Sequence, residues 1–168
     1  GEPLMNFEVI KEVVAYGREL EKLHGKVFKF TTTTNAVLMN DEIIDFLNRE
    51  MDNVVISIDG RPEVHDRMRP TPNGKGSYDL IIEKAKRFAK QRGQQRYYLR
   101  GTFTRYNLDF AEDVLHLADM GFEQLSIEPV VTDESHDYAI RESDLPRVYE
   151  EYERLGRKYV EYRQNGRW

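Results

Sequence analysis

Three groups that could hold a small charged ligand occur close together in the middle of the chain. The segment Ser-Ile-Asp-Gly at 57–60 is followed by Asp-Arg-Met-Arg-Pro at 66–70, so a hydroxyl, a carboxylate and a guanidinium follow one β-branched run. An arginine such as Arg69 is suited to bidentate capture of a carboxylate. These residues predict a site for a carboxylate-bearing ligand. A solvated loop with a surface ion pair explains the same segment equally well.

Other polar residues stand where strands are expected to end. Glu128 precedes Pro129 in an otherwise apolar run, and it needs a partner if it is buried. The run Thr31–Asn35 reads either as a functional rim or as a strand that ends in an asparagine turn. Gly1-Glu2-Pro3 is by itself typical of a turn before a helix.

Several other chemistries are not indicated. The four histidines are far apart without metal-ligand spacing, and we expect them to be surface or capping groups. The segment 74–77 (Gly-Lys-Gly-Ser) has too few glycines for a phosphate-binding loop, and it predicts a turn in which Ser77 caps the next helix. We expect no metal ligands and no identifiable catalytic residue in this chain.

The composition is typical of a folded chain. Hydrophobic residues make up 39%, charged residues 33%, and cysteine is absent. The lack of cysteine excludes disulfides and cysteine-ligated metal within these 168 residues. The net charge of -5 argues against a nucleic-acid partner, and no apolar run approaches the ~20 residues of a membrane span. We therefore expect a cytoplasmic protein.

The elements that must position these residues alternate between helix and strand. Apolar spacing predicts helices at 7–23 (closed by Gly25), from a cap at Asp41, at 80–89, at 109–120 and at 143–163. Strands are expected at 28–34, 54–58, 97–104 and 125–131. We expect the segment 60–69 to form a loop that folds back over a strand end, with a turn at Gly60 and Pro62.

This alternation predicts an α/β fold of parallel strands. An open, doubly wound sheet should be apolar on both strand faces, whereas one face here turns polar toward each strand's end, as at Arg100, Thr102 and Thr104. That favours a partial (β/α) barrel with outer helices and a ligand-holding rim.

The polar segments, taken in chain order, resemble the radical S-adenosylmethionine (SAM) superfamily. They are Gly-Glu-Pro at 1–3, Thr-Asn at 34–35, Ser-Ile-Asp-Gly at 57–60, Asp-Arg-Met-Arg-Pro at 66–70, Arg-Gly-Thr-Phe-Thr-Arg-Tyr-Asn at 100–107 and Ile-Glu-Pro-Val at 127–130. More narrowly, they resemble the SPASM-type peptide maturases. The segments 54–131 and 138–141 look most similar to the SCIFF-peptide maturases, which form thioether links in a Cys-rich precursor peptide.

The resemblance implies roles for particular residues. Gly1, Glu2 and Pro3 match the motif that holds the amino group of SAM, and Ser57 and Arg69 match residues that bind its carboxylate. Thr34 and Asn35 match a rim near SAM, although Ala36 stands where the family usually has glycine. Asp59 belongs to the matching Ser-Ile-Asp-Gly segment, while Glu128 and Val130 match the strand beside the adenine and ribose. Arg100, Thr104 and Asn107 are the residues implied to meet SAM or substrate.

The resemblance also implies what the chain lacks. The family's cluster-binding cysteines are absent, so the four-iron four-sulfur clusters would belong to a full-length parent enzyme. Residues 1–168 would then be a single internal piece of the incomplete radical SAM core, from the end of the second barrel strand to the sixth helix. We expect this piece to be inactive alone and to self-associate through its open sheet edge.

A second hypothesis comes from a different functional class. The same α/β pattern fits a non-catalytic scaffold that binds a small metabolite or a partner peptide at its strand ends. A cysteine triad encoded upstream of Gly1 would distinguish the enzyme from the scaffold.

Overall fold

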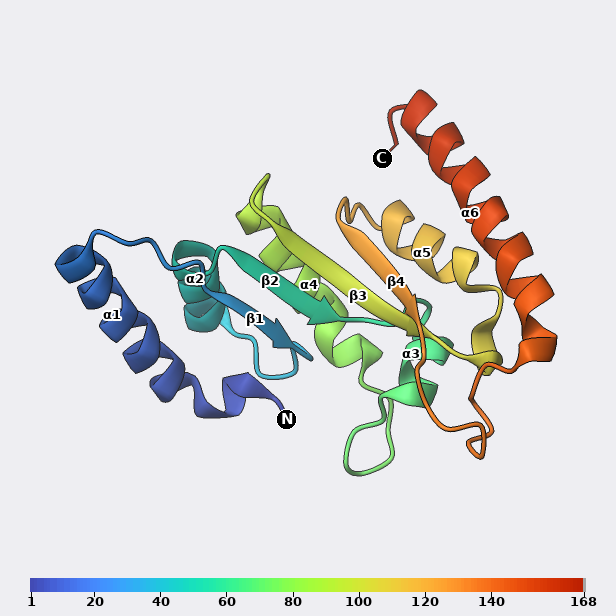
Figure 1. Cartoon of the computed structure of the whole chain (residues 1–168), viewed down its shortest axis with the longest axis horizontal. Helices are drawn as coiled ribbons and strands as arrows, with labels where there is room; N and C mark the ends of the chain where they lie inside the picture. The colour runs from blue at the N-terminus through green and yellow to red at the C-terminus, as the bar shows by residue number, and fades with distance from the viewer. Residues whose placement is uncertain (168) are drawn as a thin grey trace. The chain divides into compact units, whose positions relative to one another are not determined.

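The computed structural model describes residues 1–167, in which four strands alternate with six helices (Figure 1). The strands are β1 (Thr31–Thr34), β2 (Asn53–Ser57), β3 (Tyr97–Phe103) and β4 (Leu125–Pro129). The helices are α1 (Phe7–His24), α2 (Asp41–Glu50), α3 (Pro62–Met68), α4 (Tyr78–Arg92), α5 (Phe110–Asp119) and α6 (Leu145–Gln164). Short 3-10 turns occupy η1 (Pro3–Asn6), η2 (Arg105–Asn107) and η3 (Glu142–Asp144).

The strand order β1-β2-β3-β4 follows the chain. The β1–β2 and β3–β4 pairs are both parallel, with Thr31 opposite Asn53 and Thr102 opposite Glu128. Parallel neighbours require crossover connections, and helices supply them here. The predicted α/β class with parallel strands is therefore confirmed.

The chain is organised in two compact units, which we describe separately. The first unit comprises Gly1–Ser57 with Asp79–Tyr98, and the second comprises Ile58–Tyr78 with the chain from Leu99 onward. The interpretation of the whole chain as one piece of a barrel stays a prediction.

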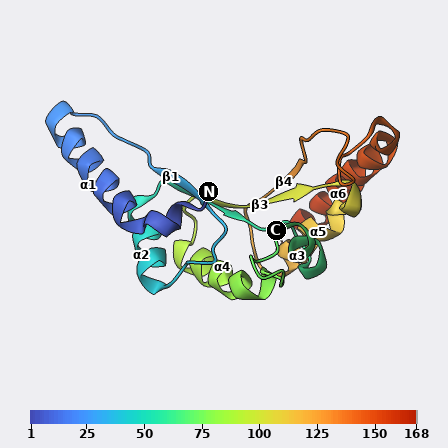
Figure 2. The same ribbon diagram turned by 90° about the horizontal axis from the view of Figure 1, so that it is seen from below.

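The first unit packs its helices through apolar faces. Helix α2 buries Ile43, Ile44, Phe46 and Leu47, and the Phe46 ring meets Phe7 edge-on at 5.2 Å between centroids. Figure 2 shows α2 and α4 on the same side of β1 and β2. Helix α1 ends at the left-handed Gly25, as its sequence predicts.

Two predicted features of the first unit differ from the structure. Asn40, not Asp41, caps α2, because its side-chain oxygen accepts a hydrogen bond from the Ile43 amide at 2.9 Å. The first strand begins at Thr31 rather than at Phe28, since the Phe28 amide donates to the Glu21 carboxylate instead of to a neighbouring strand.

The second unit is built on β3, β4, α5 and α6. The rings of Phe103 and Phe110 stack at 4.1 Å between centroids, and Val148 completes this core cluster. Helices α3 and α5 lie on one side of β3 and β4, whereas the segment 130–141 loops over the other side (Figure 2). The loop expected at 60–69 is largely the helix α3, because Pro62 fits its first turn. Strand β4 ends at Pro129, two residues earlier than expected.

A buried arginine joins several backbone groups within the first unit. Arg92 is only 2% exposed, and its guanidinium donates hydrogen bonds to the carbonyl oxygens of Leu47, Met51, Asp52 and Arg96. Burial lowers the pKa of Arg92 from its usual value, and the charge of Asp52 opposes this effect. One side chain thus satisfies carbonyls at the end of α2 and before β2.

Replacing this arginine should destabilise the protein. Arg92→Met removes charged donors from buried carbonyls, and we expect the free energy of unfolding to fall by about 3 kcal/mol. Arg87→Met is the matched control on the same helix. Its partner is the exposed Asp41, so we expect a loss below about 0.5 kcal/mol. Urea unfolding measures both, and equal losses would contradict this account.

Candidate functional site

A buried ion pair lies immediately after β2, in the second unit. The Asp59 side chain is 2% exposed and accepts two hydrogen bonds from Arg69, Nε to Oδ2 at 2.7 Å and Nη2 to Oδ1 at 2.9 Å. The Thr102 amide of β3 donates a third, at 2.9 Å, to Oδ1. The carboxylate that the sequence singles out is therefore fully paired.

A second layer of hydrogen bonds holds this pair. The Asp59 amide donates to His65 Nδ1 at 3.3 Å, His65 Nε2 lies 3.0 Å from Ser77 Oγ, and the Ser77 hydroxyl donates to the Arg69 carbonyl. Because Nδ1 accepts, the Nε2 atom carries the ring proton, and the imidazole is neutral. The expectation of a surface or capping histidine is wrong for His65, which is 1% exposed.

Asp66 fixes the start of α4. Its Oδ1 atom accepts the amides of Ser77 and Tyr78 at 2.8 and 2.7 Å, and Gly76 leaves the room that its carboxylate needs. The Ser77 hydroxyl donates to the Arg69 carbonyl, and the prediction that Ser77 caps α4 stays a prediction. A Cβ atom on Gly76 would lie 2.1 Å from Asp66 Oδ2, which explains the glycine.

A cavity of about 260 Å³ opens beside the ion pair. It is lined by Asp59, Met68, Arg69, Thr102, Thr104, Val130 and Tyr138. The Arg69 side chain keeps 35% of its surface exposed, and its bonds to Asp59 use Nε and Nη2. Nη1 is left for a further acceptor. The neighbouring Arg67, the other arginine of the segment 66–70, instead stacks on the Tyr106 ring, 3.4 Å from its centroid.

A second group of predicted residues meets in the first unit. The Glu2 carboxylate accepts hydrogen bonds from the Thr34 hydroxyl and the Asn35 amide at 2.7 Å each, and from the Leu4 amide at 3.0 Å. Ala36 follows with a left-handed φ of 61°. This conformation normally favours glycine, so the backbone at Ala36 is strained. The radical SAM family that the sequence resembles usually has glycine at this position.

The remaining predicted residues occupy varied positions. Gly1 is exposed, Pro3 begins η1 and Ser57 ends β2, all in the first unit. In the second unit Arg100 of β3 and Glu128 of β4 form an ion pair, with side chains 49% and 47% exposed.

Thr104 and Asn107, at 1% and 2% exposure, are buried instead, and Asn107 accepts the Thr104 amide and hydroxyl. The ligand contacts assigned to these residues stay predictions.

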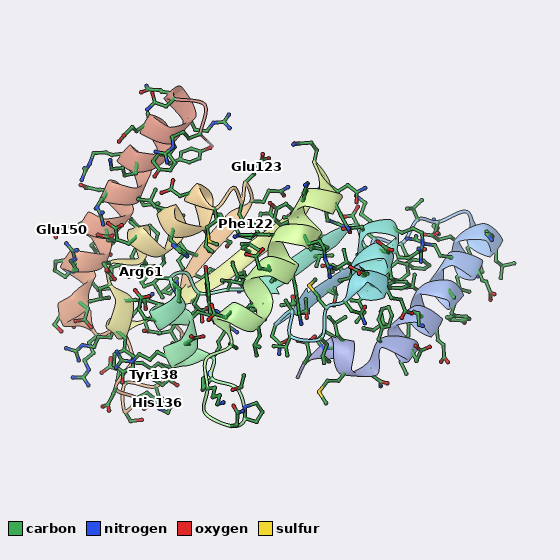
Figure 3. The ribbon with its side chains drawn as sticks, turned by 180° about the vertical axis from the view of Figure 1, so that it is seen from behind. Arg61, Phe122, Glu123, His136, Tyr138 and Glu150 are labelled. Carbon is green, nitrogen blue, oxygen red and sulfur yellow. The ribbon has the colours of Figure 1, made fainter. Side chains whose placement is uncertain are left out.

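Sequence reasoning missed part of the cavity wall. Tyr138 lines the cavity from the segment after β4, where its ring stacks on His136 at 5.1 Å between centroids (Figure 3). Met68 and Thr102 complete the wall. The alternation along β3 placed Thr102 on the polar face, but nothing local indicated that Tyr138 returns to this cavity.

Among residues 1–167 no group of three or more metal-ligating side chains is found. None of the helices in this described part is long and apolar enough to cross a membrane.

Two kinds of sequence similarity bear on this site. Residues 1–83 match the family model described as a 4Fe-4S single cluster domain. An uncharacterized protein of Methanocaldococcus jannaschii is 40% identical over 78 residues, 46% of this chain and 26% of that protein. A cysteine-type anaerobic sulfatase-maturating enzyme of Clostridium novyi is 30% identical over 87 residues, 51% of this chain and 23% of the enzyme. The chain thus spans about a quarter of these relatives.

Solved structures show the same fold. Native anSMEcpe with bound AdoMet matches with a TM-score of 0.81 at 17% identity, over 99% of this chain and 46% of that one. The same enzyme with AdoMet and a bound peptide gives 0.82 at 16% identity, over 98% and 46%. A domain of pyruvate-formate lyase-activating enzyme from Bacteroides vulgatus gives 0.59 at 17%, over 93% and 91%.

The buried histidine predicts how stability depends on pH. Burial lowers the pKa of His65, and the nearby Arg69 cation adds to this, while Asp59 and Asp66 oppose it. As the pH falls through about 6.5, the His65 imidazole therefore becomes protonated in the unfolded state but stays neutral in the folded state. The contribution of neutral His65 to the free energy of unfolding is complete above that pH, and below it the free energy of unfolding should fall by up to ~1.4 kcal/mol per pH unit.

His65→Gln should flatten this acid slope, as measured by urea unfolding between pH 7.5 and about 5. His24→Gln is the control because His24 is exposed. An unchanged slope in His65→Gln would show that the imidazole does not remain neutral.

The sequence and fold comparisons together support the resemblance to the radical SAM superfamily.

Proposed function

We propose that the full-length protein is a radical SAM enzyme that modifies a peptide or protein, and that residues 1–168 supply part of its SAM pocket. One observation carries the proposal. A fully paired carboxylate orients Arg69 at the edge of a cavity, beside the ends of parallel strands. Ligands of parallel α/β folds bind at such strand ends.

The residues fit the polar end of SAM. Its methionine carboxylate calls for a guanidinium, and Arg69 offers Nη1 toward a further acceptor while Asp59 holds the other donors. In the first unit, taken by itself, the Glu2 carboxylate has about one lone pair left after three hydrogen bonds, and the role that the resemblance implies for it stays a prediction. Thr104 and Val130, on the wall of the Arg69 cavity, would contact the rest of the molecule.

SAM, reduced by a four-iron cluster on cysteines outside this sequence, would supply the one-electron chemistry that removes a hydrogen atom from the substrate. The chain's own residues would bind and orient SAM, and Tyr138 would shield the cavity from water. Arg100 of β3 would meet SAM or substrate, and its ion-pair partner Glu128 of β4 would lie beside the adenine and ribose of SAM.

The finer proposal is a maturase that forms thioether cross-links in a Cys-rich precursor peptide. It is supported by the similarity of segments 54–131 and 138–141 to SCIFF-peptide maturases. The second candidate is oxidation of a cysteine in a partner protein, favoured by the 30% identity to a cysteine-type sulfatase-maturating enzyme. Mass spectrometry of each substrate class after incubation distinguishes the two candidates. Thioether cross-linking removes two hydrogens from the precursor peptide, whereas the second candidate changes the mass of a single cysteine residue in the partner protein.

Arg69 should dominate SAM affinity. In the full-length enzyme, Arg69→Ala removes a charged hydrogen bond and should weaken SAM binding on the order of ten- to a hundredfold. Arg69→Lys keeps a cation beside Asp59 but lacks the planar guanidinium with its two parallel donors, so we expect a smaller loss of SAM affinity than in Arg69→Ala. Arg67→Ala is the control, since Arg67 stacks on Tyr106. If Arg67→Ala carries the loss in calorimetric titration, the assignment is wrong.

The isolated 168-residue chain should hold no cluster. It has no cysteine, so after anaerobic reconstitution we expect neither stoichiometric iron nor 5′-deoxyadenosine from added SAM. Iron analysis and chromatography of the products check this. Stoichiometric iron in the purified chain would require ligands other than thiolates and would contradict the proposal.

A further inference from the structure

One buried carboxylate joins the two turns on either side of the cavity. Asp113 of α5 is fully buried, and its Oδ1 atom accepts the Arg61 amide at 3.0 Å and Arg61 Nε at 2.8 Å. Its Oδ2 atom accepts Asn107 Nδ2 at 3.0 Å. Arg61 follows β2 and Asn107 follows β3, so one side chain connects both strand ends.

Each turn contributes a residue to the cavity wall. Asp59 lies two residues before Arg61, and Thr104 is bonded to the Asn107 amide oxygen through its own amide at 2.8 Å and its hydroxyl at 3.0 Å. The Asn107 amide group is thereby oriented, with its oxygen toward Thr104 and its nitrogen toward Asp113. A shift of Asp113 would move both walls.

Close packing makes this connection rigid. Gly60 has a φ of 132°, and a Cβ atom there would lie 2.2 Å from the Cβ atom of Asp113. Burial opposes the Arg61 cation, but hydrogen bonds to Asp113 and Asp109 outweigh it and hold the pKa of Arg61 above its usual value.

We propose that Asp113 is a positioning residue for the SAM cavity: it sets the spacing of the Asp59–Arg61 and Thr104–Asn107 turns without touching the ligand. The inference rests on the proposed function. In this proposal Gly60, Arg61 and the buried Asn107 support the cavity wall and do not contact the ligand.

The donor and acceptor pattern gives a sharp test. Asp113→Asn places an amide nitrogen against Asn107 Nδ2, two donors face to face, or turns its oxygen away from Arg61. The combined change Asp113→Asn with Asn107→Asp restores every bond. The carboxylate at position 107 accepts from Thr104 and from the new amide, whose oxygen still accepts from Arg61. The swap also keeps the volume of both side chains.

In the full-length protein, Asp113→Asn should weaken SAM binding about tenfold, and Asn107→Asp alone should weaken it comparably, since two carboxylates then face each other. The double variant should recover to within about threefold of wild type. Asp109→Asn is the matched control, because Asp109 also accepts from Arg61, at 2.9 Å, whereas the Asn107 amide nitrogen donates to Asp113. Its SAM affinity should be unchanged. Single variants that bind SAM like wild type, or a folded double variant that does not recover, would overturn the proposal.

Amide hydrogen exchange separates this inference from the proposed function. The Arg61 and Thr104 amides both donate into the network, so each single variant should speed exchange at both positions, and the double variant should slow it again. If wild type binds no SAM, the proposed function fails and this measurement still decides the positioning role. Acceleration at only one of the two amides would refute it.

Discussion

The second unit depends on one constraint: a carboxylate buried at a strand end must find all of its partners within the fold. Asp59 meets this constraint with the Arg69 guanidinium and the Thr102 amide. An unpaired buried carboxylate would cost several kcal/mol, so these contacts are required by the placement of the residue. They also tie the turn after β2 to a specific residue of β3 and thereby fix one edge of the cavity.

Three further side chains then support the ion pair. His65, Ser77 and Asp66 connect the turn after β2 to the start of α4 without adding a positive charge next to Arg69. A protonated histidine here would repel the guanidinium, and burial prevents it. The cavity is thus lined by the Arg69 guanidinium, whose side chain is 35% exposed and whose orientation is set by Asp59.

The sequence predicted the order of elements better than the contacts between them. Apolar spacing is a local signal, so α1, α2 and the four strands were located to within a few residues. Helix α3 was missed because seven residues with a proline at the start carry no apolar period. The burial of His65 was missed because the partners of its ring, the Asp59 amide and the Ser77 hydroxyl, lie 6 and 12 residues away and are brought to it by packing. The strand-face alternation did place Thr102 and Thr104 correctly, since that period is also local.

The pairing of Arg69 with Asp59 also bears on how the cavity could bind a carboxylate. The side chain of an arginine that is free in solvent loses rotamer freedom on binding, at a cost of about 0.5–1.5 kcal/mol. Here the two bonds to Asp59 impose that order during folding, before any ligand arrives. The same pairing compensates part of the guanidinium charge, so long-range attraction is weaker while the remaining donor keeps its direction. We therefore expect affinity at such a site to depend on the geometry of that donor more than on net charge, and we expect Arg67, which stacks on Tyr106, not to substitute for it.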